Sequence, residues 1–257
     1  MIKALSKPQL SYIIWFSQRT GSTLLCKGLR DTGIAGKPSE WLSINNGLDF
    51  LTHYQVNNYA ELQDKIWQLG STYNSVFGLK YSMYEPHFSA VVDILKKFPT
   101  CNSESNKSCE IWNQAFPNLK HIFMTRRNKI RLAVSWWKAI KTGEWHRNIG
   151  SKPTSRDIKN KYNYNAINHL FTECCMREAA IQDFFTESEI IPLTIVYEDF
   201  VFSYQKTIQK IIDYLEIPNS NRVNIAFPLE EKLADEISEN WVQRFRKERQ
   251  QGWKNRW

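Results

Sequence analysis

The sequence predicts an α/β fold in which a mainly parallel central sheet is flanked by helices. Four short runs, at residues 12–16, 76–81, 119–125 and 190–197, are apolar, β-branched and aromatic, as in buried parallel strands. Segments of helical periodicity separate them, and strands that alternate with helices build parallel sheets with right-handed crossovers. The 257 residues, 42% of them hydrophobic, suit a single domain that covers residues 1–257.

The first strand leads into a short polar loop and then into a helix. Residues 17–21 read Ser-Gln-Arg-Thr-Gly, and the apolar positions after Ser22 keep helical spacing until about Gly33. Free N–H groups at the start of a helix attract anions, and Arg19 adds a full positive charge. The hydroxyl groups of Ser22 and Thr23 are further donors. This loop is therefore predicted to hold a phosphate-like group.

Further helices are expected where apolar residues recur at helical spacing. They cover residues 88–98, a segment from residue 129 onward, and residues 162–185, 198–216 and 230–249. Residues 100–110 are polar and are predicted to form a loop.

Basic residues stand at or just after the ends of three predicted strands. Arg19 follows the first strand, Lys80 lies near the end of the second, and Arg126 and Arg127 follow the third. The carboxyl ends of parallel strands share one edge of a sheet, and ligands bind beyond that edge. The sequence therefore predicts that these cations converge on an anion.

The net charge of +8 suits an anionic ligand. The basic residues are spread along the chain without a zinc-finger or RNP-type motif, which argues against nucleic acid as a partner. No apolar run is long enough to span a membrane, and residues 1–10 lack the features of a signal peptide. The five cysteines have neither metal-ligand nor disulfide-framework spacing, so a reduced, cytoplasmic protein without a metal site is expected.

Several stretches resemble the Stf0-type sulfotransferases, a family with a P-loop-like α/β fold. Residues 17–25 (Ser-Gln-Arg-Thr-Gly-Ser-Thr-Leu-Leu) and 33–40 (Gly-Ile-Ala-Gly-Lys-Pro-Ser-Glu) resemble the N-terminal part of that family. Residues 127–137 resemble the 3′-phosphate motif of sulfotransferases, in which an arginine and a serine are eight positions apart. Smaller similarities follow in order along nearly the whole chain, at residues 77–80, 136–145 and 239–246.

The resemblance implies transfer of the sulfuryl group of PAPS (3′-phosphoadenosine 5′-phosphosulfate) to a hydroxyl group, with release of PAP (adenosine 3′,5′-bisphosphate). The transfer is expected to be an in-line displacement helped by positioning and charge neutralisation. A sulfuryl group carries less charge than a phosphoryl group, so bound cations can replace a metal ion. By this resemblance the first loop holds the 5′-phosphosulfate through Arg19, Thr20, Gly21, Ser22 and Thr23.

The same resemblance assigns the 3′-phosphate to Arg127 and Ser135 and the role of general base to Glu40. Lys80, at a strand end, is predicted to steady the transferring oxygens. Cytosolic sulfotransferases use a histidine base instead. His53 and His87 are the candidates here, so the base is open between Glu40 and a histidine.

The acceptor is predicted to be a small molecule with a hydroxyl group. Lys37 stands where trehalose-type members carry an acid beside the base, which argues against trehalose. Another carbohydrate and a natural-product alcohol are both open, and the alcohol is slightly favoured. A homodimer is expected by family analogy.

Two other functions stay open. One is a P-loop-like kinase that uses ATP and magnesium, which is disfavoured because Gly21 is followed by Ser22 rather than by a Lys-[Ser/Thr] pair. The other is a basic module that binds PAP or RNA and has lost catalysis.

Overall fold

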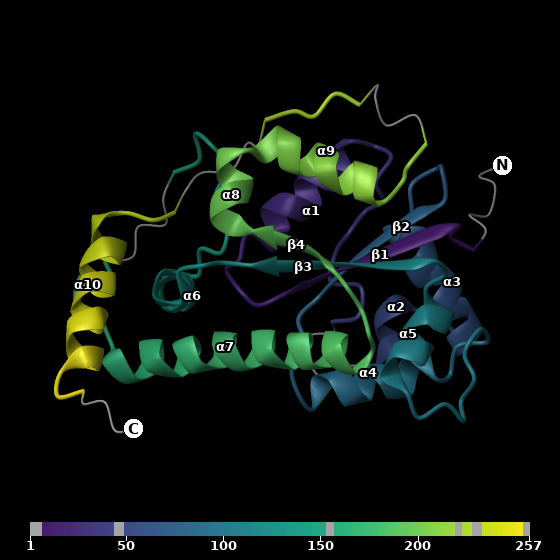
Figure 1. Cartoon of the computed structure of the whole chain (residues 1–257), viewed down its shortest axis with the longest axis horizontal. Coiled ribbons are helices and arrows are strands. Elements are labelled where there is room, and N and C mark those ends of the chain that lie inside the picture. Colours follow the sequence, from purple (N-terminus) through teal and green to yellow (C-terminus); the bar gives the residue numbers. More distant parts are fainter. Residues whose placement is uncertain (1–6, 44–48, 153–156, 219–222, 228–232, 254–257) are drawn as a thin grey trace.

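A four-stranded sheet lies at the centre of the computed structural model, which describes residues 7–43, 49–152, 157–218, 223–227 and 233–253. The strands run in the order β2-β1-β3-β4, and each neighbouring pair is parallel (Figure 1). Their bounds are Leu10–Phe16 for β1, Val76–Tyr81 for β2, Leu119–Thr125 for β3 and Leu193–Val196 for β4. The predicted parallel sheet flanked by helices is confirmed.

Helices cover both faces of this sheet (Figure 1). One face packs against α1 (Ser22–Asp31), α8 (Tyr197–Phe202) and α9 (Tyr204–Tyr214). The other packs against α2 (Phe50–Tyr54), α3 (Tyr59–Gly70), α4 (His87–Leu95), α5 (Ser108–Ala115) and α7 (Tyr164–Glu187). Two more helices, α6 (Lys129–Thr142) and α10 (Glu236–Gln250), lie on the side of the carboxyl ends of the strands.

The alternating side chains of β1 explain why this strand is apolar from Tyr12 to Phe16. Tyr12, Ile14 and Phe16 pack among the residues of α1 and α9. Ile13 and Trp15 point to the opposite face and join its aromatic core. All five are at most 4% exposed, because helices cover both faces of the strand.

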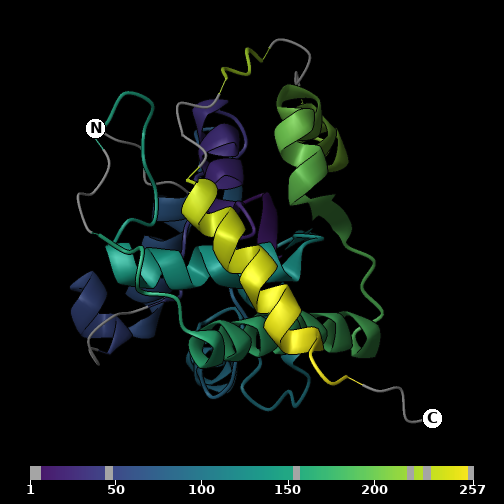
Figure 2. The same ribbon diagram turned by 90° about the vertical axis from the view of Figure 1, so that its left-hand side faces the viewer.

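A third group of buried residues joins α6, α7 and α10, with Leu132, Trp136 and Trp241 among its members. Figure 2 shows α10 crossing over α6. The start of α10 is fixed by a capping box, in which the Asp235 carboxylate accepts from the N–H of Ser238 and the Ser238 hydroxyl bonds back to the N–H of Asp235. Residues of α10 are thereby held beside those of α6.

Two predicted boundaries near the fourth strand are wrong. The strand begins at Leu193 rather than at residue 190, because Pro192 has no N–H to donate and Ile191 is 92% exposed. The single helix expected over residues 198–216 is divided into α8 and α9 by the non-helical backbone of Ser203.

Other helices differ from the prediction in extent or were not expected. The last helix begins at Glu236, and the predicted start at residues 230–232 lies outside the described residues. Helix α5 begins inside the predicted 100–110 loop, and α2 and α3 were not among the predicted helices. The five cysteines carry free thiols in the structure. Among the described residues, no helix has both the length and the apolar character needed to cross a membrane.

Candidate active site

The loop at residues 17–21 joins β1 to α1 and has a tightly constrained backbone. Arg19 has φ 65° and Gly21 has φ 87°, both in the left-handed region. A Cβ atom built on Gly21 would lie 2.5 Å from the ring of Tyr197. Glycine is therefore required at this position for both the backbone angle and the packing. Thr20 is buried beneath the loop, where its hydroxyl donates to the Ser17 carbonyl at 2.8 Å.

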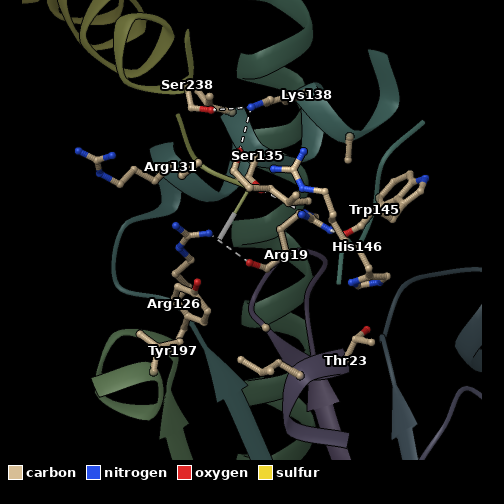
Figure 3. Close-up of a pocket in the computed structure, with 18 of the residues that line it drawn as sticks. Arg19, Thr23, Arg126, Arg131, Ser135, Lys138, Trp145, His146, Tyr197 and Ser238 are labelled. Atoms are coloured by element: carbon tan, nitrogen blue, oxygen red, sulfur yellow. Dashed lines mark hydrogen bonds between the residues drawn. The ribbon is translucent and has the colours of Figure 1, made fainter. Parts of the chain in front are cut away.

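The Arg19 side chain connects this loop to α6 and to the segment that follows it (Figure 3). Its Nε donates to the Ser135 hydroxyl at 3.1 Å, and its Nη1 donates to the Trp145 carbonyl at 2.6 Å. Arg19 and Ser135 are 116 residues apart in the chain. The fold thus brings together two residues that the family resemblance assigns to opposite ends of one ligand.

A cavity of about 940 Å³ lies next to Arg19 at the carboxyl-end edge of the sheet. The start of α1, one face of α6, helix α8 and the first turns of α10 line it. Basic side chains outnumber carboxylates in this lining, so an anion is favoured there. The basic residues are Arg19, Arg126, Arg131, Lys138 and Arg147, and the carboxylates are Glu144, Glu198 and Glu239.

Arg126 is a largely buried basic residue of the cavity lining, with a side chain that is 13% exposed. Burial lowers the pKa of its guanidinium below the usual value. Its carbon Cζ lies 4.6 Å from the Tyr197 ring, and Nη1 donates to the Arg19 carbonyl at 3.4 Å. Its Nε is buried without a hydrogen-bond partner among the described residues, with the Glu198 carboxylate 3.8 Å away. The Arg126 guanidinium therefore adds a positive charge to the wall of the cavity.

Beside the cavity, one buried ammonium group joins three predicted site residues. Lys80 Nζ lies 2.8 Å from Glu40 Oε1 and donates to Thr23 Oγ1 at 3.0 Å. The Lys80 side chain is 11% exposed and the Glu40 side chain 47% exposed. The carboxylate is therefore accessible to a small molecule while the lysine holds it next to the first turn of α1.

A family model described as Stf0 sulphotransferase matches residues 11–248 of this chain. The chain belongs to the Stf0 sulphotransferase family.

Two relatives match the Stf0 chain over almost its entire length. The trehalose 2-sulfotransferase of Mycolicibacterium smegmatis is 26% identical over 264 residues, which cover 93% of this chain and 96% of the relative. The trehalose 2-sulfotransferase of Mycobacterium tuberculosis is 24% identical over 271 residues, with 95% and 97% covered. Among solved structures, the sulfotransferase domain of the Synechococcus PCC 7002 olefin synthase aligns with a TM-score of 0.39 at 13% identity, covering 94% of this chain and 96% of that domain.

Most of the residues predicted for the Stf0 site are close together. Arg19, Ser135 and the 21–23 turn line the cavity, and Lys80 and Glu40 adjoin it through Thr23.

Arg127 lies apart from this group. Its Nη1 and Nη2 donate to the two oxygens of the Asp199 carboxylate at 2.8 and 2.5 Å, and these bonds raise the pKa of Arg127. The Arg127 side chain is largely exposed. It does not belong to the described lining of the cavity, so its role at the 3′-phosphate stays a prediction.

The two predicted alternative bases also lie away from the cavity lining. His87 Nδ1 bonds to the Tyr81 hydroxyl at 2.8 Å and its ring stacks on Tyr84. Burial and the nearby Arg177 lower the pKa of His87. His53 contacts the Tyr54 ring edge-on. A histidine that the sequence did not single out, His146, does line the cavity.

Sequence reasoning also missed two basic residues of α6. Arg131 and Lys138 line the cavity together with Ser135, at helical positions i, i+7 and i+4. This spacing places all three on one face, so the signal was present in the sequence. Their partners on α10 had no local signal: Arg131 pairs with Glu239 at 2.6 Å and Lys138 with Asp235 at 2.6 Å.

Proposed function

We propose that this single-domain Stf0 enzyme transfers the sulfuryl group of PAPS to a hydroxyl group of a small acceptor and releases PAP. The observation that carries the proposal is the contact of Lys80 with both Glu40 and Thr23. It holds an accessible carboxylate beside the turn that starts α1. A base and an anion-binding loop therefore lie side by side, as transfer from an anionic donor to a hydroxyl group requires.

The residues present fit a donor with two anionic ends. The 5′-phosphosulfate is assigned to Arg19, to the N–H groups of Thr20, Gly21, Ser22 and Thr23, and to the hydroxyl groups of Ser22 and Thr23. The Thr20 hydroxyl donates to the Ser17 carbonyl instead. The excess of basic side chains in the cavity lining supports an anionic ligand. A metal ion is not needed for this assignment.

The 3′-phosphate is assigned to Ser135 together with an arginine of residues 126–131. The spacing of the family motif selects Arg127, whereas Arg126 and Arg131 line the cavity. Titrating separate alanine variants of these three arginines with PAP will show which arginine binds the 3′-phosphate.

The chemistry then follows from the positions of these side chains. Glu40 takes the proton of the acceptor hydroxyl group as its oxygen attacks the sulfur. The bond from sulfur to the bridging phosphate oxygen breaks, and PAP leaves with that oxygen. The ammonium of Lys80 lies where it can stabilise negative charge on the transferring group, and it keeps the Glu40 carboxylate in place.

The acceptor is assigned to a class rather than to one compound. The two named relatives are trehalose 2-sulfotransferases, which supports a small carbohydrate. Lys37 departs from the acid predicted for trehalose-type members, which supports another sugar or a natural-product alcohol. A homodimer and a cytoplasmic location stay predictions of the sequence.

The test is PAPS turnover with a panel that contains trehalose, other sugars and small alcohols, read as PAP release and as the mass of the sulfated product. Replacing Glu40 by glutamine keeps the side-chain shape but removes the base, so kcat is expected to fall by about 10²–10⁴ with little change in the Kd of PAP. Glu216→Gln is the matched control, because Glu216 also pairs with a strand lysine, Lys120.

PAP binding without sulfated product from any acceptor would favour the non-catalytic module. Phosphoryl transfer from ATP and magnesium, with no use of PAPS, would favour the kinase.

A further inference from the structure

The middle of α7 carries a buried carboxylate that none of the proposed catalytic steps uses. Glu178 is 5% exposed and receives three donors. The Ser17 hydroxyl donates to its Oε1 at 2.9 Å, and the Thr125 hydroxyl donates to its Oε2 at 2.7 Å. The ammonium of Lys129 lies 2.5 Å from the same Oε2. Lys129 also donates to the Thr125 hydroxyl at 2.8 Å, which closes the network.

These donors come from two separate segments at the edge of the sheet. Ser17 directly follows β1 and begins the loop that carries Arg19. Thr125 ends β3, and Lys129 is the first residue of α6, the helix that carries Ser135. Glu178, on the α7 side of the sheet, therefore connects the residues at which the Arg19 loop and α6 begin, and both of these segments line the cavity.

Further contacts connect the starts of these two segments to the residues assigned to PAPS. The Ser17 carbonyl accepts from the buried Thr20 hydroxyl, so the position of Ser17 sets that of the next residues in the loop. At the far end, Arg19 Nε meets Ser135 at 3.1 Å. A shift of the loop relative to α6 would change this separation.

Stability alone does not account for a carboxylate in this position. Removing both charges of a pair from water costs about as much as their attraction returns, so an apolar pair of equal volume is often as stable. Three donors that converge on one carboxylate are directional, however, and fix their elements relative to one another in a way that apolar contacts do not.

We propose that Glu178 is a positioning residue that holds the Arg19 loop and α6 at the separation at which both phosphates of the donor are bound at once. This inference rests on the proposed function, because it requires a ligand with two anionic ends. It predicts that loss of Glu178 weakens the simultaneous binding of two phosphates more than the binding of either phosphate alone.

The experiment compares the Kd values of PAP, adenosine 5′-phosphate and adenosine 3′-phosphate, measured by calorimetry well below the melting temperature. Glu178→Gln is expected to raise the Kd of PAP by about tenfold or more, since small misplacements of binding groups are costly. Each monophosphate, which needs one segment only, is expected to change by no more than about threefold. Asp183→Asn, an exposed position on the same helix, removes an equal charge and serves as the control.

A second variant keeps the test independent of folding defects in Glu178→Gln. Ser17→Ala frees the Arg19 loop but leaves the Glu178–Lys129 pair intact, so a smaller loss of about threefold, confined to PAP, is expected. Equal weakening of all three ligands, or no change in either variant, would overturn the positioning role. A wild-type protein that does not bind PAP would overturn the proposed donor as well, so the two failures are distinguishable.

Discussion

Replacing Lys80 by methionine removes one ammonium group and keeps most of the side-chain volume. In the structure this ammonium lies 2.8 Å from Glu40 Oε1 and 3.0 Å from Thr23 Oγ1. It also lies 5.1 Å from the centroid of the Phe16 ring, so methionine meets an apolar neighbour. We expect a large loss of turnover and a small change in stability.

The exposure of the two partners sets the size of each effect. Because the Glu40 side chain is 47% exposed, water replaces the lost ammonium around its carboxylate. An ion pair with such an exposed partner contributes about 1 kcal/mol or less to folding, which corresponds to about 2–4 °C in melting temperature for a chain of this size. By contrast, a preorganised charge beside the transferring group is worth about 10²–10³ in kcat.

The assay is the initial rate of PAP release at saturating PAPS and acceptor, together with a thermal melt of each variant. Lys120→Met is the matched control: it also removes a strand lysine paired with a glutamate, Glu216 at 3.1 Å, but Lys120 lies near the amino end of β3. Turnover of Lys80→Met within about threefold of wild type would refute the reasoning. A loss that matches the unfolded fraction would refute it equally.

Two further perturbations have defined outcomes. Arg131→Ala is expected to raise the Kd of PAP by about tenfold, which is the effect of losing one charge-assisted contact. Arg127→Ala is expected to raise this Kd less, because Asp199 holds Arg127 outside the cavity lining. Calorimetry measures both Kd values, and a larger effect of Arg127→Ala would support the assignment from the family motif. Burial lowers the pKa of His121 to about 4, and its Nδ1 accepts from the Trp15 indole, so the neutral ring stabilises the fold fully above pH 6.5. As the pH falls from 6.5 to 4 the unfolded chain binds a proton that the folded chain does not, and up to about 3 kcal/mol of unfolding free energy is lost. Urea unfolding of wild type and His121→Gln should show this loss in wild type alone; equal pH dependence in both would exclude His121 as its source.

The sheet could be predicted because its strands are buried on both faces. The neighbours Ile13 and Ile14 point to opposite cores, and both are fully buried, so β1 reads as a continuous apolar run. The start of β4 was less predictable. Ile191 is apolar but exposed, and composition alone cannot separate it from a core residue.

The candidate site could be predicted where it depends on a local element. The 17–21 loop could be predicted from an apolar strand, a polar segment that ends in glycine and the start of an amphipathic helix, and all three are visible in the sequence. The sequence did not show which of the neighbouring residues Arg126 and Arg127 lines the cavity. Spacing alone selects Arg127, whereas in the fold Arg126 is turned inward and Arg127 outward to Asp199.

Contacts between distant parts of the chain left no sequence signal. Glu178 lies 161 residues from Ser17, and in the sequence it reads as one polar position of a long helix. Asp199 lies 72 residues after Arg127, and its place in the sequence likewise does not indicate its partner. Such pairs are determined by how α7 and α8 pack on the sheet, which no local periodicity specifies.

The measurement that tests the central claim most directly is a calorimetric titration of the wild-type protein with PAP and, separately, with ATP and magnesium. A PAPS-dependent Stf0 enzyme is expected to bind PAP with a micromolar Kd and ATP far more weakly, because the cavity would hold a 3′-phosphate that ATP lacks. Equal or tighter binding of ATP, or no binding of PAP, would contradict the account, and the basic cavity beside Arg19 would then belong to another anion.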